Sequence, residues 1–256
     1  MTTYLEAVLL GFIQGLTEWL PVSSSGHLQV GRALLGLEAD TWYDLLLHVG
    51  TLGVILLVYW RRILQLVAAA FGPASNEKRF AWGLVLGSVP IAVTGFLLAD
   101  LVESAFEHLP AVGAALLFTA YFLHSTKGLE GKARIGPRSA WSIGLWQVLA
   151  LLPGVSRSGA TIAGGLHAGL DRETAADFGF LLAVPALVGA TLFKATDVAD
   201  PTLTGPMVVG ILVSLVTGYV TLQWLRGFVA RRGIHAFAPY CLVLGAAVLG
   251  LSIVSP

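Results

Sequence analysis

Six long apolar runs constrain this chain more than any other feature of its sequence. Each is about as long as the roughly 20 residues that a helix needs to cross the hydrocarbon core of a bilayer. Only 12% of the residues are charged, whereas a soluble domain carries about 25%. The runs predict an all-α polytopic membrane protein with six transmembrane helices. They cover residues 42–60, 80–102, 110–125, 175–197, 205–225 and 236–255.

Two further apolar regions, residues 1–40 and 141–170, are interrupted near their middles by proline, glycine and serine. Non-helical backbone is tolerated at membrane depth only where it is buried in protein or lines a wet cavity, because lipid offers it no hydrogen-bond partner. These regions therefore predict two re-entrant helical hairpins. No polar stretch is long enough to fold alone, so we expect residues 1–256 to form a single membrane domain.

Charged residues between the apolar runs are distributed unevenly. Basic residues gather in three loops, whereas the alternate loops carry Glu103, Glu107, Asp197 and Asp200. Cytoplasmic loops are enriched in Lys and Arg, which predicts that the three basic loops are cytoplasmic and that both termini lie outside. The formal net charge is +0, so nothing indicates nucleic-acid binding. The basic loop residues are Arg61, Arg62, Lys78, Arg79, Lys127, Lys132, Arg134, Arg138, Arg226, Arg231 and Arg232.

The chain resembles itself at an offset of 133 residues. Between positions 11 and 44, 12 of 34 residues are identical to the residue 133 positions later. We interpret this as a duplication, with repeat 1 at about 1–125 and repeat 2 at about 141–256, each a hairpin plus three spans. Because three is odd, the second repeat is inserted upside down. The hairpin tips, near Ser23 and Ser156, then meet close to the midplane, where inverted repeats with broken helices commonly build a site.

The first hairpin carries the sequence "QGLTEWLPVSSSGH" at residues 14–27. Gln14 and Glu18 are four residues apart and share one helix face. A proline ends that helix, and the three serines that follow favour a turn and an N-cap. Ser24 and His27 are three apart, close enough to hydrogen-bond across one turn. Ionisable residues inside a membrane are costly and usually functional.

The second hairpin carries "PGVSRSGAT" at residues 153–161. Ser156 or Ser158 can cap the helix that follows, and a helix N-terminus with free N–H groups binds anions. Arg157 adds a permanent cation whose fork geometry suits phosphate, and Thr161 lies four residues beyond it. An arginine at membrane depth needs an anionic partner, for which Glu18 or a ligand phosphate is suitable.

Together the two tips offer a hydroxyl, an imidazole, a carboxylate and an arginine, the groups that phosphoryl transfer requires. Two other functions fit parts of the pattern. A transporter that flips a lipid phosphate or carries an anion would use inverted repeats and broken helices, but it has no need of a nucleophile. An intramembrane serine protease would use a Ser–His pair, but not the arginine. His48, inside an apolar run, is interpreted as a packing residue, with lining of the cavity as the alternative.

The two motifs resemble the signatures of the undecaprenyl-diphosphate phosphatase family, the bacitracin resistance proteins. That family's patterns are a Glu/Gln-x-x-x-Glu helix running into LPVSS-x-GH, and PG-x-SRSG-x-T. Here they stand as Gln14 to Glu18, "LPVSSSGH" and "PGVSRSGAT", and the resemblance covers essentially the whole chain. It implies a plasma (inner) membrane enzyme that hydrolyses a polyprenyl diphosphate to its monophosphate. This activity recycles the lipid carrier of cell-wall synthesis and confers bacitracin resistance.

The resemblance also implies the composition of the site. The site is expected to open to the extracytoplasmic face and to need a divalent cation, Mg²⁺ or Ca²⁺, and a homodimer is plausible. Glu18 carries over as the metal ligand. Gln14 stands where many members have glutamate, and it is a weaker second ligand because a neutral amide binds a hard cation less well than a carboxylate. The core residues carried over are Glu18, Ser24, His27 and Arg157, and the supporting phosphate ligands are Ser23, Ser156, Ser158 and Thr161.

Our mechanistic hypothesis from the sequence is that Ser24 attacks the terminal phosphorus while His27 manages protons. Arg157 then clamps the departing charge, and Glu18 positions the metal. His27 as the nucleophile is the open alternative.

Overall fold

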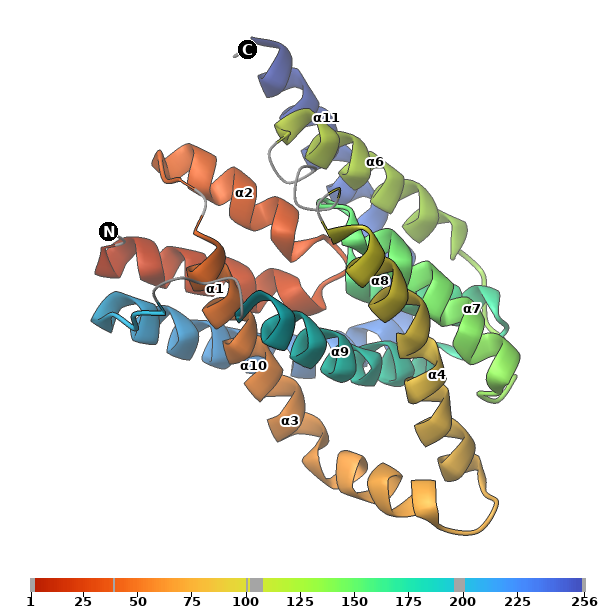
Figure 1. Cartoon of the computed structure of the whole chain (residues 1–256). Coiled ribbons are helices and arrows are strands. Elements are labelled where there is room, and N and C mark those ends of the chain that lie inside the picture. Colours follow the sequence, from red (N-terminus) through yellow and green to blue (C-terminus); the bar gives the residue numbers. More distant parts are fainter. Residues whose placement is uncertain (1–2, 39, 100, 102–107, 196–200, 255–256) are drawn as a thin grey trace.

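A computed structural model describes residues 3–38, 40–99, 101, 108–195 and 201–254, and Figure 1 shows its helices in sequence colours. Within these residues every regular element is helical apart from one isolated bridge between Ala133 and Leu170, which confirms the all-α prediction. The α-helices are α1 (Tyr4–Trp19), α2 (Ser24–Leu35), α3 (Thr41–Phe71), α4 (Asn76–Leu97), α6 (Leu109–Ser125), α7 (Pro137–Val148), α8 (Arg157–His167), α9 (Arg172–Ala195), α10 (Gly205–Arg232) and α11 (Ala238–Val254). Two short 3₁₀ helices are η1 (Leu149–Leu151) and η2 (Ile234–Phe237).

Among the described residues, five helices are long and apolar enough to cross a membrane: α3, α4, α9, α10, and η2 joined to α11. The remaining predicted span, residues 110–125, forms α6, which at 17 residues is shorter than the other five. α3 runs well past the predicted end at residue 60, because Arg61 and Arg62 are good helix formers and the helix meets no breaker before Gly72.

The two interrupted regions each form a pair of short helices joined by a polar turn. α1 ends at Trp19, just before Pro21, and α2 begins at Ser24. Likewise α7 and η1 end before the turn at Pro153, and α8 begins at Arg157. In both turns a serine caps the second helix, because Ser23 Oγ accepts from Gly26 N and Ser156 Oγ accepts from Gly159 N.

Helices from the two halves of the chain pack against one another. α1 lies along α10, and α7 lies along α4 (Figure 1). Both contacts are backbone to backbone: a Cβ added at Gly11 would lie 2.4 Å from Gly210 O, and one at Gly144 would lie 2.5 Å from Gly87 O. Small residues at these positions therefore allow the close approach that membrane helices use for packing.

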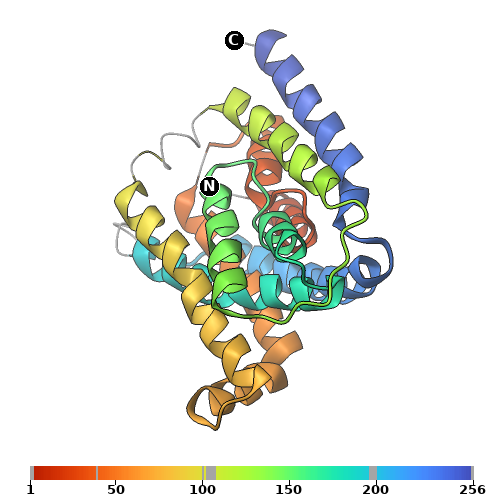
Figure 2. The same cartoon turned by 90° about the vertical axis from the view of Figure 1, so that its right-hand side faces the viewer.

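α6 and α11 form a third packed pair, and they lie side by side along one edge of the molecule in both views (Figures 1 and 2). The main apolar core includes residues of α6 and α11, such as Phe122 and Cys241, together with residues of the other long helices. It also includes Trp19, whose ring meets Phe180 edge-on at 6.1 Å. Because Trp19 follows Glu18 directly, this fully buried ring fixes the end of α1 that carries the polar turn.

Candidate active site

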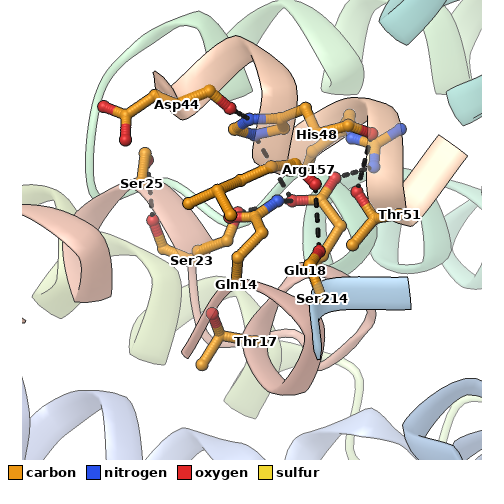
Figure 3. Close-up of polar contacts among 12 residues, drawn as sticks. Gln14, Thr17, Glu18, Ser23, Ser25, Asp44, His48, Thr51, Arg157 and Ser214 are labelled. Carbon is orange, nitrogen blue, oxygen red and sulfur yellow. Dashed lines mark hydrogen bonds and ion pairs between the residues drawn. The ribbon is translucent and has the colours of Figure 1, made fainter. Parts of the chain in front are cut away.

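Glu18 is the centre of a polar cluster, with only 6% of its surface exposed. Its Oε1 accepts from Arg157 Nη2 at 2.5 Å, and its Oε2 accepts from Gln14 Nε2 at 3.0 Å (Figure 3). Oε2 also accepts from Ser24 Oγ at 2.6 Å. These partners come from α1, α2 and α8. The carboxylate therefore joins the two polar turns, and the anionic partner expected for the arginine is confirmed as Glu18.

Arg157 is the first residue of α8, and its side chain is 16% exposed. Nη2 is bound to Glu18, but Nη1 is buried and has no hydrogen-bond partner among the described residues. An unpaired buried N–H is costly, so this donor is available for an anionic group that enters the cluster. A phosphate oxygen has the charge and the acceptor geometry to bind it.

Gln14 is fully buried and sits one helical turn before Glu18. Its Nε2 donates to Glu18, whereas its Oε1 has no partner among the described residues. Nowhere in the described chain are three His, Cys, Asp or Glu side chains grouped to hold an ion. One carboxylate, an orphaned amide oxygen and a serine hydroxyl nonetheless form an oxygen-rich donor set. Such a set fits a divalent cation whose remaining ligands are phosphate oxygens and water.

His27 differs from the expectation that it would bond Ser24. Its Nδ1 lies 2.7 Å from Ser23 O, so this nitrogen donates to the carbonyl, and Tyr240 O–H donates to Nε2 at 2.7 Å. The two rings are also stacked, with centroids 5.7 Å apart. The Ser23 carbonyl and the Tyr240 hydroxyl of α11 therefore hold the His27 ring. Ser24 donates to Glu18 instead.

The hydroxyls expected to bind phosphate are engaged mainly in holding the turns. Ser23 lies 3.2 Å from the Ser25 hydroxyl, and Ser156 lies 3.2 Å from that of Ser158. Ser158 also bonds across to the first turn, donating to Leu20 O at 3.0 Å. These contacts give both turns the same internal scaffold and press one against the other.

Two threonines near the turns, Thr161 and Thr119, form hydrogen bonds with backbone groups. Thr161 has its hydroxyl on the carbonyls of Arg157 and Ser158, at 3.0 and 3.2 Å. Thr119 of α6 donates to Gly154 O and accepts from Ser156 N. Thr119 thereby supports the second turn from outside, as Tyr240 does beside the first, and neither was singled out from the sequence.

His48 of α3 belongs to the cluster and was interpreted from the sequence as a packing residue. Its Nδ1 is 2.7 Å from Asp44 O, and its Nε2 is 3.6 Å from Glu18 Oε2 (Figure 3). The side chain is 27% exposed, whereas Leu47 beside it is fully buried. An ionisable side chain inside an apolar run was the available signal, since such residues in membrane segments usually face the protein interior or a cavity.

Comparison with known proteins extends over the whole chain. The sequence model for the bacitracin resistance protein BacA matches residues 7–247. Three similar proteins are each named undecaprenyl-diphosphatase. The one from Desulfosudis oleivorans is 43% identical over 96% of this chain and 97% of its own length. Those from Korarchaeum cryptofilum and Methanosphaera stadtmanae are 37% and 36% identical, over 96% and 99% of this chain and 98% and 100% of their own lengths.

Proposed function

This chain belongs to the BacA family of bacitracin resistance proteins, and we infer that it is an undecaprenyl-diphosphatase. The enzyme hydrolyses undecaprenyl diphosphate to undecaprenyl phosphate and inorganic phosphate. Its long apolar helices and its family make it a multi-pass membrane protein. The observation in the structure that best supports the activity is the meeting of a hydroxyl, a carboxylate and a guanidinium at Ser24, Glu18 and Arg157.

Ser24 Oγ is the proposed nucleophile, and Glu18 is its base. The hydroxyl proton lies on the 2.6 Å hydrogen bond to Glu18 Oε2, so the carboxylate accepts it as Oγ approaches the terminal phosphorus. As the Oγ–P bond forms, the bond from phosphorus to the bridging oxygen breaks. Glu18 passes its proton to the departing undecaprenyl phosphate. Water then attacks the seryl phosphate, giving one proton through Glu18 to Ser24 Oγ, and inorganic phosphate leaves.

Arg157 neutralises charge that develops in this reaction. Its buried Nη1 has no partner among the described residues, and a substrate phosphate oxygen would supply one. Preorganised donors of this kind stabilise transition-state charge more than the same donors in water. We propose that Glu18 and Gln14 also hold a divalent cation, which supplies further positive charge beside the phosphate oxygens when bound.

We propose that repeats 1–125 and 141–256 are related by inverted topology and that residues 1–40 and 141–170 are re-entrant hairpins. The exchange of partners supports this, because α1 of the first repeat packs on α10 of the second and α7 of the second packs on α4 of the first. The repeat mates Gly36 and Gly169 also both adopt positive φ, 65° and 83°. With the basic loops cytoplasmic, the site opens outward and both termini lie outside.

Phosphate release by the purified protein in detergent, with undecaprenyl diphosphate and a divalent cation, tests the activity and the nucleophile together. Ser24→Ala should lower turnover by about 10³-fold or more, because the attacking group is lost. Ser25→Ala is the matched control, since it removes a neighbouring hydroxyl that does not contact Glu18, and it should lower turnover far less. Near-normal turnover of Ser24→Ala together with loss of turnover in His27→Ala would identify His27 as the nucleophile in place of Ser24.

A lipid-phosphate flippase or anion transporter is the second candidate, because the exchanged packing of broken helices resembles transporter architecture. Wild-type protein that releases no phosphate in detergent but moves a lipid phosphate or an anion across vesicles would replace the hydrolase by the transporter.

A further inference from the structure

His48 presents an uncommitted ring nitrogen to the active-site carboxylate. Because the Asp44 carbonyl can only accept, the 2.7 Å contact requires Nδ1 to carry the proton. The other nitrogen, Nε2, then has its lone pair free in the neutral ring. A histidine fixed by Nδ1–H on a backbone carbonyl, with Nε2 left open, is the arrangement found in metal-ligating histidines.

The separation of the two ligand atoms suits one shared ion. Nε2 lies 3.6 Å from Glu18 Oε2, which is too far for a hydrogen bond. Two ligand atoms each about 2.1 Å from one ion are about 3.6 Å apart when they subtend about 118° at the metal. That angle falls between the tetrahedral and trigonal values, so neither side chain has to move far to share an ion.

Gln14 supplies an independent sign of a missing ligand. Its Oε1 is buried without a partner among the described residues, while its Nε2 competes for the same Glu18 oxygen that faces His48. A half-turn of the amide exchanges the two atoms. An ion beside Oε2 would then bind Oε1, so that one ion satisfies both the orphaned oxygen and the free His48 lone pair.

We propose that His48 Nε2 is a ligand of the divalent cation at Glu18, and that the site consequently prefers a first-row transition ion to Mg²⁺ or Ca²⁺. Imidazole is a good ligand for such ions, whereas Mg²⁺ and Ca²⁺ prefer oxygen ligands alone. The neutral amide of Gln14 strengthens this preference, because the site offers one carboxylate where a hard cation is better held by two. The inference rests on the proposed diphosphatase site and names the chemistry of its metal.

Mn²⁺ is a suitable probe, since it accepts both oxygen and imidazole ligands and is visible by electron paramagnetic resonance. Full-length protein in detergent, with inorganic phosphate, would be saturated with Mn²⁺ and examined by electron spin echo envelope modulation. A directly bound imidazole gives a ¹⁴N modulation. We expect this modulation in the wild type, its loss in His48→Gln, and its retention in His167→Gln, a control that removes a histidine stacked on Trp146 outside the cluster.

Affinity gives a second measurement. His48→Gln should weaken Mn²⁺ binding by roughly 10- to 100-fold, whereas His48→Glu, which supplies an oxygen ligand, should raise affinity for Mg²⁺ relative to Mn²⁺. A wild type that binds no Mn²⁺, that binds it without ¹⁴N modulation, or whose modulation survives in His48→Gln overturns the proposal. Because binding is measured without turnover, an active wild type with any of these results loses only the His48 ligand, and an inactive wild type contradicts the diphosphatase itself.

Discussion

At both polar turns the first serine caps the helix that follows, and its hydroxyl lies 3.2 Å from that of the serine two residues later. Each turn is also held from outside by the third long helix of the other half: α6 through Thr119 at the second turn, and α11 through Tyr240 at the first. The serine contacts are thus the same in both turns, whereas the outside contacts differ in kind. Thr119 binds backbone of the second turn, and Tyr240 binds the His27 side chain of α2.

The residues between the capping serines are where the turns differ. The first turn has Ser24 where the second has Arg157, and Glu18 of α1 corresponds by the 133-residue offset to Leu151. The two halves therefore supply opposite charges to one point, and neither half holds the complete site. Because the serine contacts are duplicated and the central residues differ, the nucleophile and its base from one half lie opposite a cation from the other half.

Removal of the charge that joins the turns should have the largest effect. Arg157→Met leaves the Glu18 carboxylate buried without its cation, and breaking a buried pair on one side costs about 3–5 kcal/mol. We expect the free energy of unfolding to fall by about that amount and phosphate release to be lost. Titration with SDS followed by circular dichroism measures the first, and the detergent assay measures the second.

The double variant Glu18→Gln/Arg157→Met is the sharper test, because it removes both charges and should be less destabilised than Arg157→Met alone. Arg134→Met removes an exposed arginine and should stay within about 0.5 kcal/mol of the wild type. A double variant at least as unstable as the single one would mean that the ion pair does not hold the turns together.

An intermediate effect on stability should appear where the first helix of each half packs against a helix of the other half. Gly11→Ala and Gly144→Ala place a methyl group against the backbone of α10 and α4, and such overpacking costs about 1–3 kcal/mol. Similar losses of unfolding free energy for both variants would support equivalent packing in the two halves. A loss at one glycine alone would break the comparison.

Gly189→Ala is the matched control for these two variants. It also adds a methyl group to a glycine within a long helix, but nothing lies within 4 Å of the new atom. The helix should gain about 0.5–1 kcal/mol from the change.

The smallest effect should come from the backbone of the capping serines. Ser23 has φ 70°, whereas its mate Ser156 has φ −75°. Positive φ costs a non-glycine residue about 1–2 kcal/mol, so Ser23→Gly relieves a strain that Ser156→Gly does not. The loss of the cap and the entropy of the unfolded chain are common to both variants. We expect Ser23→Gly to be about 1 kcal/mol less destabilising than Ser156→Gly by SDS titration, and equal losses would contradict this.

Much of the local architecture could be predicted from the sequence. Pro21 and the serines after it determine where α1 ends and α2 begins, because proline cannot continue a helix and serine caps one. That Arg157 needs an anionic partner also followed, because an arginine at membrane depth is costly alone. The sequence left Glu18 and a ligand phosphate as candidates, and the structure shows Arg157 bound to Glu18. These predictions depended on local chemistry and on the cost of charge in lipid.

The detailed geometry of the site could not be predicted. Spacing placed Ser24 near His27, but the Ser23 carbonyl and Tyr240, which lies 213 residues away, bind both nitrogens of that ring. His48 was missed for a similar reason. Its neighbour Glu18 is on another helix, and only the packing of α3 against α1 brings the two together.

The pairing of Glu18 with Arg157 also has a consequence for the order of events during synthesis. α1 is synthesised before α8, so Glu18 has no arginine partner until the chain has grown by another 139 residues. At ribosomal rates of about 5–20 residues per second, that interval lasts roughly 7 to 28 s. During that interval we expect the first polar turn to stay near the hydrated lipid headgroups. It should move inward only when Arg157 has entered the membrane. The first half of the chain then reaches its final position after the second half has begun to insert.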